Sequence, residues 1–487
     1  MKRITSTLKQ VFKNPAILYV LSRYGTYIIQ FVNSLFIAVY LGPYYLGIWG
    51  FINLVLGYIN QFNLGIPYSL NVIISVNKDK EEYVKTVINN SLTMMAGLCI
   101  FILLLIVLSF IFGINIGEKF EFTTFVIPVF IIAVATHFNS LLSNVFRVFG
   151  EIFAITVNQS LFTILTFLVV FFFKGKDLLW AIIFVNIVSV LISLILFLYR
   201  TPIKLKFSFD IKFIKYIQQK GWHLFIYNSS FAFILITTKS FISESYSVEE
   251  YGYFTFSFSL ANAILLLLNS ISYLVTPKIT HRFANSDLNH IKNILKEVRS
   301  SYISLSHLLI HFVIMIFPLF LILFPQYNHV NYLFKVTALT VVLTTNLFGY
   351  NNLLAARGKE KILSHLAFSI LILNILLAFG FISGLKVQFD YVMFPTMIAY
   401  FIFAFLLAFY GRKVLRLPIT LIEIVKDIFP WRMALPFIFS ILLIMLAAPD
   451  IYFTIPFVVY MLLNLNDLKG IKDLGIKLIK NPNFINI

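Results

Sequence analysis

Charged residues and cysteine are scarce in this sequence, and each scarcity excludes a class of protein. Only 12% of the 487 residues are charged and 60% are hydrophobic, whereas soluble globular proteins carry about twice that charged fraction. The single cysteine, Cys99, lies in an apolar run. It is typical of a small packing residue and leaves no disulfide framework. A soluble multidomain enzyme is therefore excluded.

The sequence also lacks the motifs of nucleotide-hydrolysing enzymes and metalloenzymes. It contains no GxxxxGK[ST] segment that would hold phosphates and no HExxH segment that would hold zinc. Neither paired cysteines nor a pair of carboxylates occurs inside an apolar run. We therefore expect a protein that is not an enzyme and that uses neither a cofactor nor a metal.

Apolar segments of membrane-spanning length make up most of the chain. A helix needs roughly 20 mostly apolar residues to cross the hydrocarbon core. Hydropathy predicts an all-α integral membrane protein with about fourteen spanning helices, as two groups of six followed by two shorter segments. The predicted spans are residues 16–40, 46–70, 87–112, 123–145, 152–173 and 178–199, then 222–242, 251–275, 301–324, 332–355, 362–383 and 391–410, and finally 433–448 and 452–465.

The basic residues fall almost entirely on one predicted side of the membrane. The net charge is +18, but Lys and Arg stand in short loops, so we expect anionic inner-membrane lipids and no nucleic acid as partners. With the N-terminus inside, 31 of the 38 basic residues lie in inner loops or termini and 4 in outer loops. Because cytoplasmic loops retain Lys and Arg during insertion, both termini are predicted to be cytoplasmic. The first apolar segment is too long for a signal peptide and is predicted to be retained as a helix.

Two of the longer inner connections carry apolar residues at helical spacing. They predict either helices that lie in the membrane interface or segments that cover neighbouring helix ends. No loop is long enough for a catalytic domain or for the large outer loop of a polysaccharide polymerase. The residues at helical spacing are Phe209, Phe213, Ile214 and Ile217 in one connection, and Leu421, Ile424, Val425 and Ile428 in the other.

Two sequence patterns recur at an offset of about 205 residues. GPYYLGIWGF begins at residue 42 and SVEEYGYFTF at residue 247, while RVFGE at residue 147 is matched by ARGKEK at residue 356. The repeat predicts two six-helix halves inserted in the same orientation, with a cavity between them. The expected domains are residues 1–200, residues 201–410, and residues 411–487, which hold a linker, two additional helices and a cytoplasmic tail.

Several stretches of the sequence together resemble a known transporter family. They are YLGPYYLGIWGF, LGIPYSL, SVEEYGYFTFSFSLANAI, and NNLLAARGKEK followed by LILNILLAFGFI. The chain resembles, over essentially its whole length, the Wzx-type O-antigen and polysaccharide flippases of the multidrug/oligosaccharidyl-lipid/polysaccharide (MOP) exporter superfamily. The resemblance implies a MATE-like fold and a lipid-linked oligosaccharide substrate, carried on undecaprenyl pyrophosphate. It also implies polysaccharide polymerase and glycosyltransferases as partners in surface polysaccharide and lipopolysaccharide biosynthesis.

The charged side chains inside the predicted spans are basic rather than acidic. Arg23 lies about eight residues into the first span, or roughly 12 Å at 1.5 Å per residue. Lys239 stands where many relatives carry Asp, so the coupling role of that acid is not expected here. Arg23, Lys239, Arg147 and Lys335 are the candidate substrate-binding residues, because cations bind phosphate oxygens. Snorkelling to the interface is the alternative for each, above all for Arg147 and Lys335 near helix ends. His137 is either proton-linked or a packing histidine.

The resemblance implies that the protein moves a lipid-linked oligosaccharide across the inner membrane by alternating access, and the basic residues in the spans predict that Arg23 and Lys239 meet its pyrophosphate in a basic cavity. The alternatives are a lipid II flippase, a multidrug antiporter and a non-transporting membrane scaffold. No acidic residue lies deep in a predicted span, which weighs against an antiporter that exports cations. A polar, alternately open cavity would favour the flippase over the scaffold.

Overall fold

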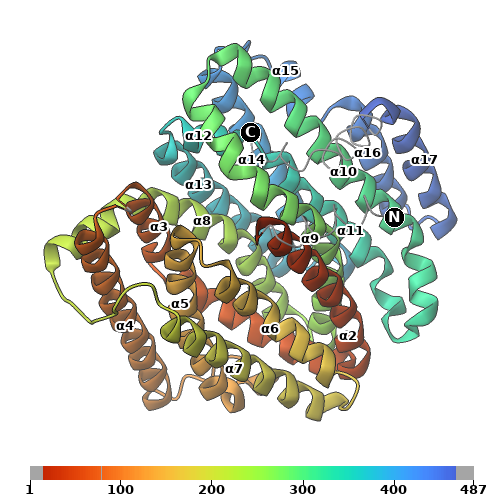
Figure 1. The fold of residues 1–487 in the computed structure, drawn as a ribbon. Coiled ribbons are helices and arrows are strands. Elements are labelled where there is room, and N and C mark those ends of the chain that lie inside the picture. Colours follow the sequence, from red (N-terminus) through yellow and green to blue (C-terminus); the bar gives the residue numbers. More distant parts are fainter. Residues whose placement is uncertain (1–14, 78, 468–487) are drawn as a thin grey trace, which may run out of the picture. The chain divides into compact units, whose positions relative to one another are not determined.

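The computed structural model describes residues 15–77 and 79–467, and within these ranges all regular secondary structure is helical (Figure 1). A helix satisfies its backbone hydrogen bonds within one segment, which is the condition for crossing a bilayer. The expected all-α fold is therefore confirmed. The basic residues before residue 15 and the tail from residue 468 onward, both expected to be cytoplasmic, lie outside the described ranges, as does the side chain of Lys278.

The chain divides into two compact units. The first consists of Met1–Ile236 with Tyr246–Gly252, and the second of Thr237–Ser245 with Tyr253–Ile487. The boundary thus falls near the junction of two long helices, α8 (Ile211–Ser245) and α9 (Val248–Asn285). The expected division at residues 200 and 410 follows membrane topology and stays a prediction.

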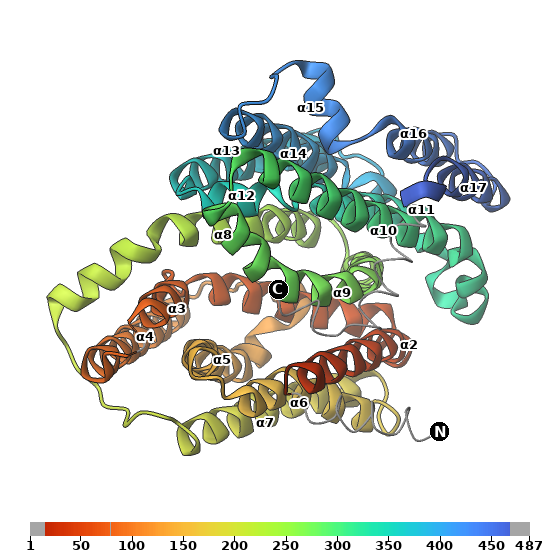
Figure 2. The ribbon, with the colours of Figure 1, turned by 45° about the horizontal axis from the view of Figure 1, so that its top comes forward.

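The first unit contains six helices besides most of α8. Within it, α2 packs on α6, α6 on α7, α7 on α5 and α5 on α3 (Figure 2). The elements are α2 (Pro15–Gln61), α3 (Ile66–Val76), α4 (Glu81–Ile111), the short turns η1 (Glu118–Phe120) and η2 (Phe122–Phe125), α5 (Val126–Phe149), α6 (Ile152–Val169) and α7 (Gly175–Tyr199).

The second unit contains most of α9 and the remaining helices. Its central helix α14 contacts α11, α12, α13 and α15. Its last two helices pack on each other, and α17 also packs on α10 while α16 packs on α11. The elements are α10 (Leu288–Leu323), η3 (Pro325–Val330), α11 (Asn331–Val342), η4 (Leu343–Leu347), α12 (Tyr350–Ala356), α13 (Glu360–Ala378), η5 (Phe379–Gly384), η6 (Phe389–Tyr391), α14 (Phe394–Val414), α15 (Leu421–Ile428), α16 (Trp431–Met445), η7 (Asp450–Phe453) and α17 (Thr454–Leu463).

Ten helical segments among the described residues are long and apolar enough to cross a membrane, or up to eleven if the bent pair α15–α16 forms one span. The expected number was fourteen, and the difference has identifiable sources. α2 is counted once although its backbone breaks, α9 includes side chains that are not described, and α3 and α17 are short. The multi-pass membrane fold is confirmed, and the count of fourteen stays a prediction.

The break in α2 lies in the first of the repeated patterns. Gly42 has φ 72° and ψ 168°, a conformation that is essentially restricted to glycine. Pro43 follows it directly, and a proline is favoured at the first position of a helix because its missing N–H would be unpaired there. The chain therefore turns at Gly42, where the sequence predicted an outer turn, and the second part of α2 returns through the unit (Figure 1).

Two glycines bring α2 and the start of α9 into backbone contact. A Cβ added at Gly252 would lie 1.9 Å from the carbonyl oxygen of Pro43, and one added at Gly47 would lie 2.0 Å from that of Val248. Both glycines belong to the repeated patterns that begin at residues 42 and 247. Small residues permit such close packing between membrane helices, where lipid removes the hydrophobic reason to associate.

We predict that Gly252→Ala destabilises the protein by about 1–3 kcal/mol, the usual cost of overpacking a closely fitted contact. Gly97→Ala in α4 is the matched control, because no atom lies within 4 Å of the added Cβ. The measurement is thermal unfolding of the purified protein in detergent. A Gly252→Ala variant that melts with the wild type would contradict the close approach.

Candidate functional site

Within the described part of the chain, no acidic side chain pairs with the positive charge of Arg23. It is half-buried on α2, its guanidinium lies 4.5 Å from the ring centroid of Tyr27, and it donates a hydrogen bond to the hydroxyl of the same tyrosine. No carboxylate in the described part of the chain lies within ion-pair distance of it. A guanidinium on an aromatic ring keeps its charge and its remaining donors available. Arg23 can therefore bind an anion.

Lys239 is held in a similar way in the second unit. It is half-buried on α8, with its Nζ atom 3.8 Å from the ring centroid of Phe258. Its neighbour Thr238 exchanges a 2.7 Å hydrogen bond with Thr396 of α14 and accepts one of 3.0 Å from Asn374 of α13. Across the residues that the structure describes, Lys239 forms no ion pair. Its charge therefore lies beside a polar cluster.

Lys335 is fully buried and paired with an acid. Its Nζ atom lies 2.5 Å from Oδ1 of Asp450, which also accepts a 2.8 Å hydrogen bond from Asn331. The same Nζ atom lies 3.8 Å from the ring centroid of Phe453. Because its charge is already balanced, the geometry supports a structural role over substrate binding. The predicted topology places Lys335 and Asp450 on the same outer side of the membrane. This shared side was the signal in the sequence that could have indicated the ion pair.

Arg147 and His137 both lie on α5 but in different environments. Arg147 is exposed in the last turn of the helix, just before the left-handed cap at Gly150, where a cation is favoured by the helix dipole. This position supports the anchor interpretation. His137 is buried and hydrogen-bonds to the backbone of Ile59, while its Nε2 atom has no hydrogen-bond partner. Its proton-linked role stays a prediction.

The five candidate residues are thus distributed over both units. Arg23, Arg147 and His137 lie in the first unit, and Lys239 and Lys335 in the second. The contacts described above join Arg23, Lys239, Lys335 and His137 to residues other than these five. Arg23 and Lys239 share one property, a half-buried cation held against an aromatic ring without an acidic partner among the described residues.

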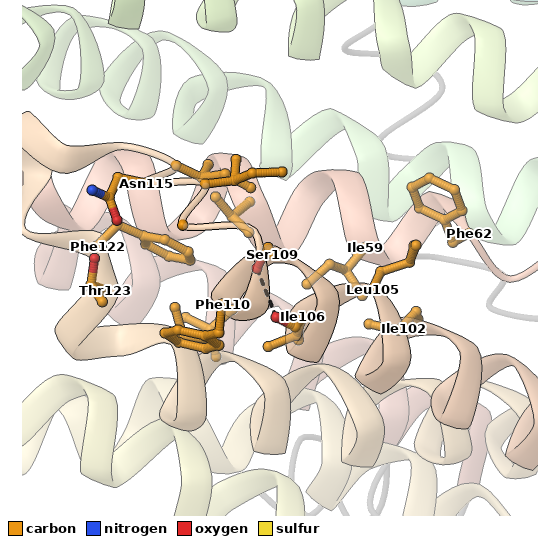
Figure 3. Close-up of a pocket in the computed structure, with 16 residues that line it drawn as sticks. Ile59, Phe62, Ile102, Leu105, Ile106, Ser109, Phe110, Asn115, Phe122 and Thr123 are labelled. Atoms are coloured by element: carbon orange, nitrogen blue, oxygen red, sulfur yellow. Dashed lines mark hydrogen bonds between the residues drawn. The ribbon is translucent and has the colours of Figure 1, made fainter.

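A cavity of about 250 Å³ lies in the first unit between α2, α4 and α5 (Figure 3). Its lining is almost wholly aliphatic and aromatic, and it includes no charged residue. The polar lining residues are Ser109, Asn115 and Thr123, and the hydroxyl of Ser109 is bonded to the carbonyl of Ile106 at 2.7 Å. Such a cavity suits a hydrocarbon chain and cannot pair with the charge of a diphosphate.

A buried ionic cluster in the second unit was not foreseen. Arg299 and Arg412 were expected among the loop charges, yet they are only 5% and 4% exposed. Arg412 and the hydroxyl of Tyr350 both donate to Oδ2 of Asp427 on α15. Arg299 donates to the carbonyls of Asn346 and Phe348, where the helical run through η4 ends. These two cations hold helix ends together, so they are not free to bind substrate.

The sequence matches a known protein family over more than half of its length. Residues 12–281 match the family described as "Polysaccharide biosynthesis protein". The chain belongs to this family. No match is found among curated protein sequences. Membership confirms the resemblance to Wzx-type flippases that the repeated patterns indicated.

Solved structures of similar fold agree with this assignment. One is described as the lipid II flippase MurJ in an inward closed conformation, with a TM-score of 0.70 and 15% identity over 94% of this chain and 99% of that one. Another is an inward-facing multidrug resistance MATE family transporter of the MOP superfamily, with a TM-score of 0.66 and 13% identity over 82% and 98%. A MATE structure in the straight conformation has a TM-score of 0.60 and 14% identity over 84% and 98%. At such identities the likeness shows the fold alone, which this chain shares with these three structures.

Variants of Lys335 and Asp450 can test whether the buried cation of Lys335 stabilises the fold or binds substrate. Asp450→Asn leaves a buried ammonium without its carboxylate and should destabilise the flippase. The double variant Lys335→Met, Asp450→Asn should recover part of that loss, with a coupling energy of about 0.5–3 kcal/mol. The measurement is thermal unfolding of all four proteins together with their transport activity. Loss of transport in Lys335→Met at unchanged stability would instead support a substrate-binding role.

Proposed function

We propose that this flippase moves undecaprenyl-pyrophosphate-linked oligosaccharide units across the bacterial inner membrane by alternating access, for surface polysaccharide biosynthesis. The observation that carries the proposal is the match of residues 12–281 to the polysaccharide biosynthesis family. The fold, shared with a lipid II flippase and with MATE transporters, supports movement of a large amphipathic substrate. The proposed partners are glycosyltransferases, which would supply the lipid-linked substrate, and a polysaccharide polymerase, which would use the translocated product.

The charges inside the membrane support an anionic headgroup. A substrate diphosphate needs a cation that no carboxylate already balances. Arg23 and Lys239 each meet this condition among the residues that the structure describes. The guanidinium of Arg23 can donate two parallel hydrogen bonds to phosphate oxygens. We propose that each of the two residues binds the diphosphate during the transport cycle.

The carrier lipid also has a long apolar tail, and the cavity between α2, α4 and α5 has a lining compatible with such a chain. This lining supports a lipid substrate over a hydrophilic one. It does not separate the polysaccharide precursor from lipid II, which has the same kind of carrier. The family description favours the polysaccharide precursor, and a proteoliposome assay supplied with each lipid in turn decides between them. Movement of neither lipid would support the scaffold alternative.

The orientation of the flippase in the membrane is proposed from the distribution of Lys and Arg, with both termini cytoplasmic. In a Cys99→Ser background, single cysteines in place of Glu118, Asp177 and Glu249 should react with an impermeant thiol reagent added outside intact cells. All three positions are exposed in the structure. A cysteine at Lys359, in a predicted inner loop, should react only after the membrane is permeabilised. The reverse labelling pattern would invert the proposed topology.

Arg23→Ala should reduce surface polysaccharide roughly 10- to 100-fold while leaving the amount of flippase in the membrane unchanged. A charge-assisted hydrogen bond contributes about 1.5–3 kcal/mol, and 1.4 kcal/mol corresponds to tenfold. Lys361→Ala is the matched control, since Lys361 is an exposed cation in the first turn of α13. The measurement is quantitative blotting of polysaccharide and of protein. If polysaccharide persists in Arg23→Ala, Arg23 is an interfacial anchor.

A further inference from the structure

The connection between α7 and α8, residues 200–210, is an extended segment that α4 holds in place. Three alternate backbone N–H groups donate to side chains of α4. Lys206 N bonds to Asn89 Oδ1 at 2.9 Å, Ser208 N to Thr93 Oγ1 at 2.9 Å, and Asp210 N to Asn90 Oδ1 at 2.7 Å. The sequence interpretation that placed Phe209 in an interfacial helix was wrong, because α8 begins only at Ile211. We call residues 200–210 the strap; in Figure 2 it is the yellow thread that passes α4.

The strap is also anchored by its first apolar residues. Ile203 belongs to the hydrophobic core of the first unit, and Leu205 packs against that core. Thr201 closes a local turn by donating to the carbonyl of Ile203 at 2.8 Å. With its backbone fixed at both ends, the strap presents its remaining side chains in a defined direction. The entropy of ordering them is therefore lost on folding and not when a partner binds.

Those remaining side chains combine exposed aromatic rings with positive charge. Phe207 and Phe209 are 72% and 74% exposed, and residues two apart in an extended chain lie on the same face. The strap follows directly after the candidate span that ends at Tyr199, which is itself 86% exposed. Six basic residues of the strap and the start of α8 are exposed, against one acid, Asp210: Arg200, Lys204, Lys206, Lys212, Lys215 and Lys220.

We propose that the strap is a membrane-surface element that binds anionic phospholipid. Phe207 and Phe209 insert at the boundary between headgroups and acyl chains, and the six cations lie against the lipid phosphates. Exposed aromatic rings beside a basic cluster are complementary to the interface of a membrane that contains anionic lipid. The position just beyond the end of α7 gives the strap the depth of the interface. The proposal does not depend on which lipid-linked substrate the flippase carries.

The test uses the full-length protein in lipid nanodiscs. In a Cys99→Ser background, cysteines in place of Phe207 and Phe209 are labelled with the environment-sensitive fluorophore NBD, and a cysteine at Lys359, in an exposed loop, is the matched control. Spin-labelled phosphatidylglycerol should quench the labels at positions 207 and 209 at least about twofold more strongly than the control label. It should also quench them more strongly than spin-labelled phosphatidylcholine does.

Charge removal tests the specificity for anionic lipid. Lys204→Gln with Lys206→Gln should reduce the preference for phosphatidylglycerol over phosphatidylcholine by about tenfold or more, since each basic residue near an anionic surface contributes about 1 kcal/mol. Raising the salt concentration should have the same direction of effect. The proposal would be overturned if the labels at positions 207 and 209 stay in water. It would also be overturned if both lipids quench these labels equally, whether or not the two lysines are present. A shift that requires an added soluble protein would overturn it as well, in favour of a protein partner.

Discussion

A lipid bilayer gives two apolar helices no hydrophobic reason to pair, because lipid tails are as apolar as leucine. The architecture of this flippase therefore depends on a small number of polar bonds and close backbone contacts. In the first unit, Thr26 of α2 bonds to Ser160 of α6 at 2.7 Å, and Asn33 donates to the carbonyl of Thr163 at 2.7 Å. Apolar side chains at these positions could pack against other helices equally well, so these two hydrogen bonds select the partner helix and its register.

The second unit follows the same rule at its C-terminal end. The hydroxyl of Tyr460 on α17 donates to the carbonyl of Ser304 on α10 at 2.6 Å, and Asp467 pairs with Arg432 at 3.3 Å. Lys335 and Asp450 join the start of α11 to the turn before α17. Removing one partner of the Tyr460 contact or of the Lys335 contact leaves a buried polar group unsatisfied, so the short C-terminal helices depend on these polar contacts.

The same constraint separates cations with a structural role from cations available to a substrate. Arg299, Arg412 and Lys335 are bonded to carbonyls or carboxylates, and their charge stabilises helix ends. Arg23 and Lys239 instead rest on aromatic rings. An ion in the membrane is costly when it has no partner, so two cations without an acidic partner among the described residues are consistent with a transient anionic partner. The proposed diphosphate supplies that partner during transport.

The sequence by itself determined the membrane-embedded helical class, the family and the turn at Gly42, because hydropathy, sequence motifs and glycine and proline signals are local properties of the chain. It also located Arg23 and Lys239 as cations inside apolar runs. Only the tertiary structure decided which cations are already paired. Lys335 and Asp450 are 115 residues apart, and Arg299 reaches the carbonyl of Asp427 across 128 residues. The strap was likewise unpredictable, since the apolar spacing around Phe209 is that of a helix. Its extended backbone is instead held by hydrogen bonds to Asn89, Asn90 and Thr93. Such contacts depend on the three-dimensional meeting of distant segments, which no local pattern encodes.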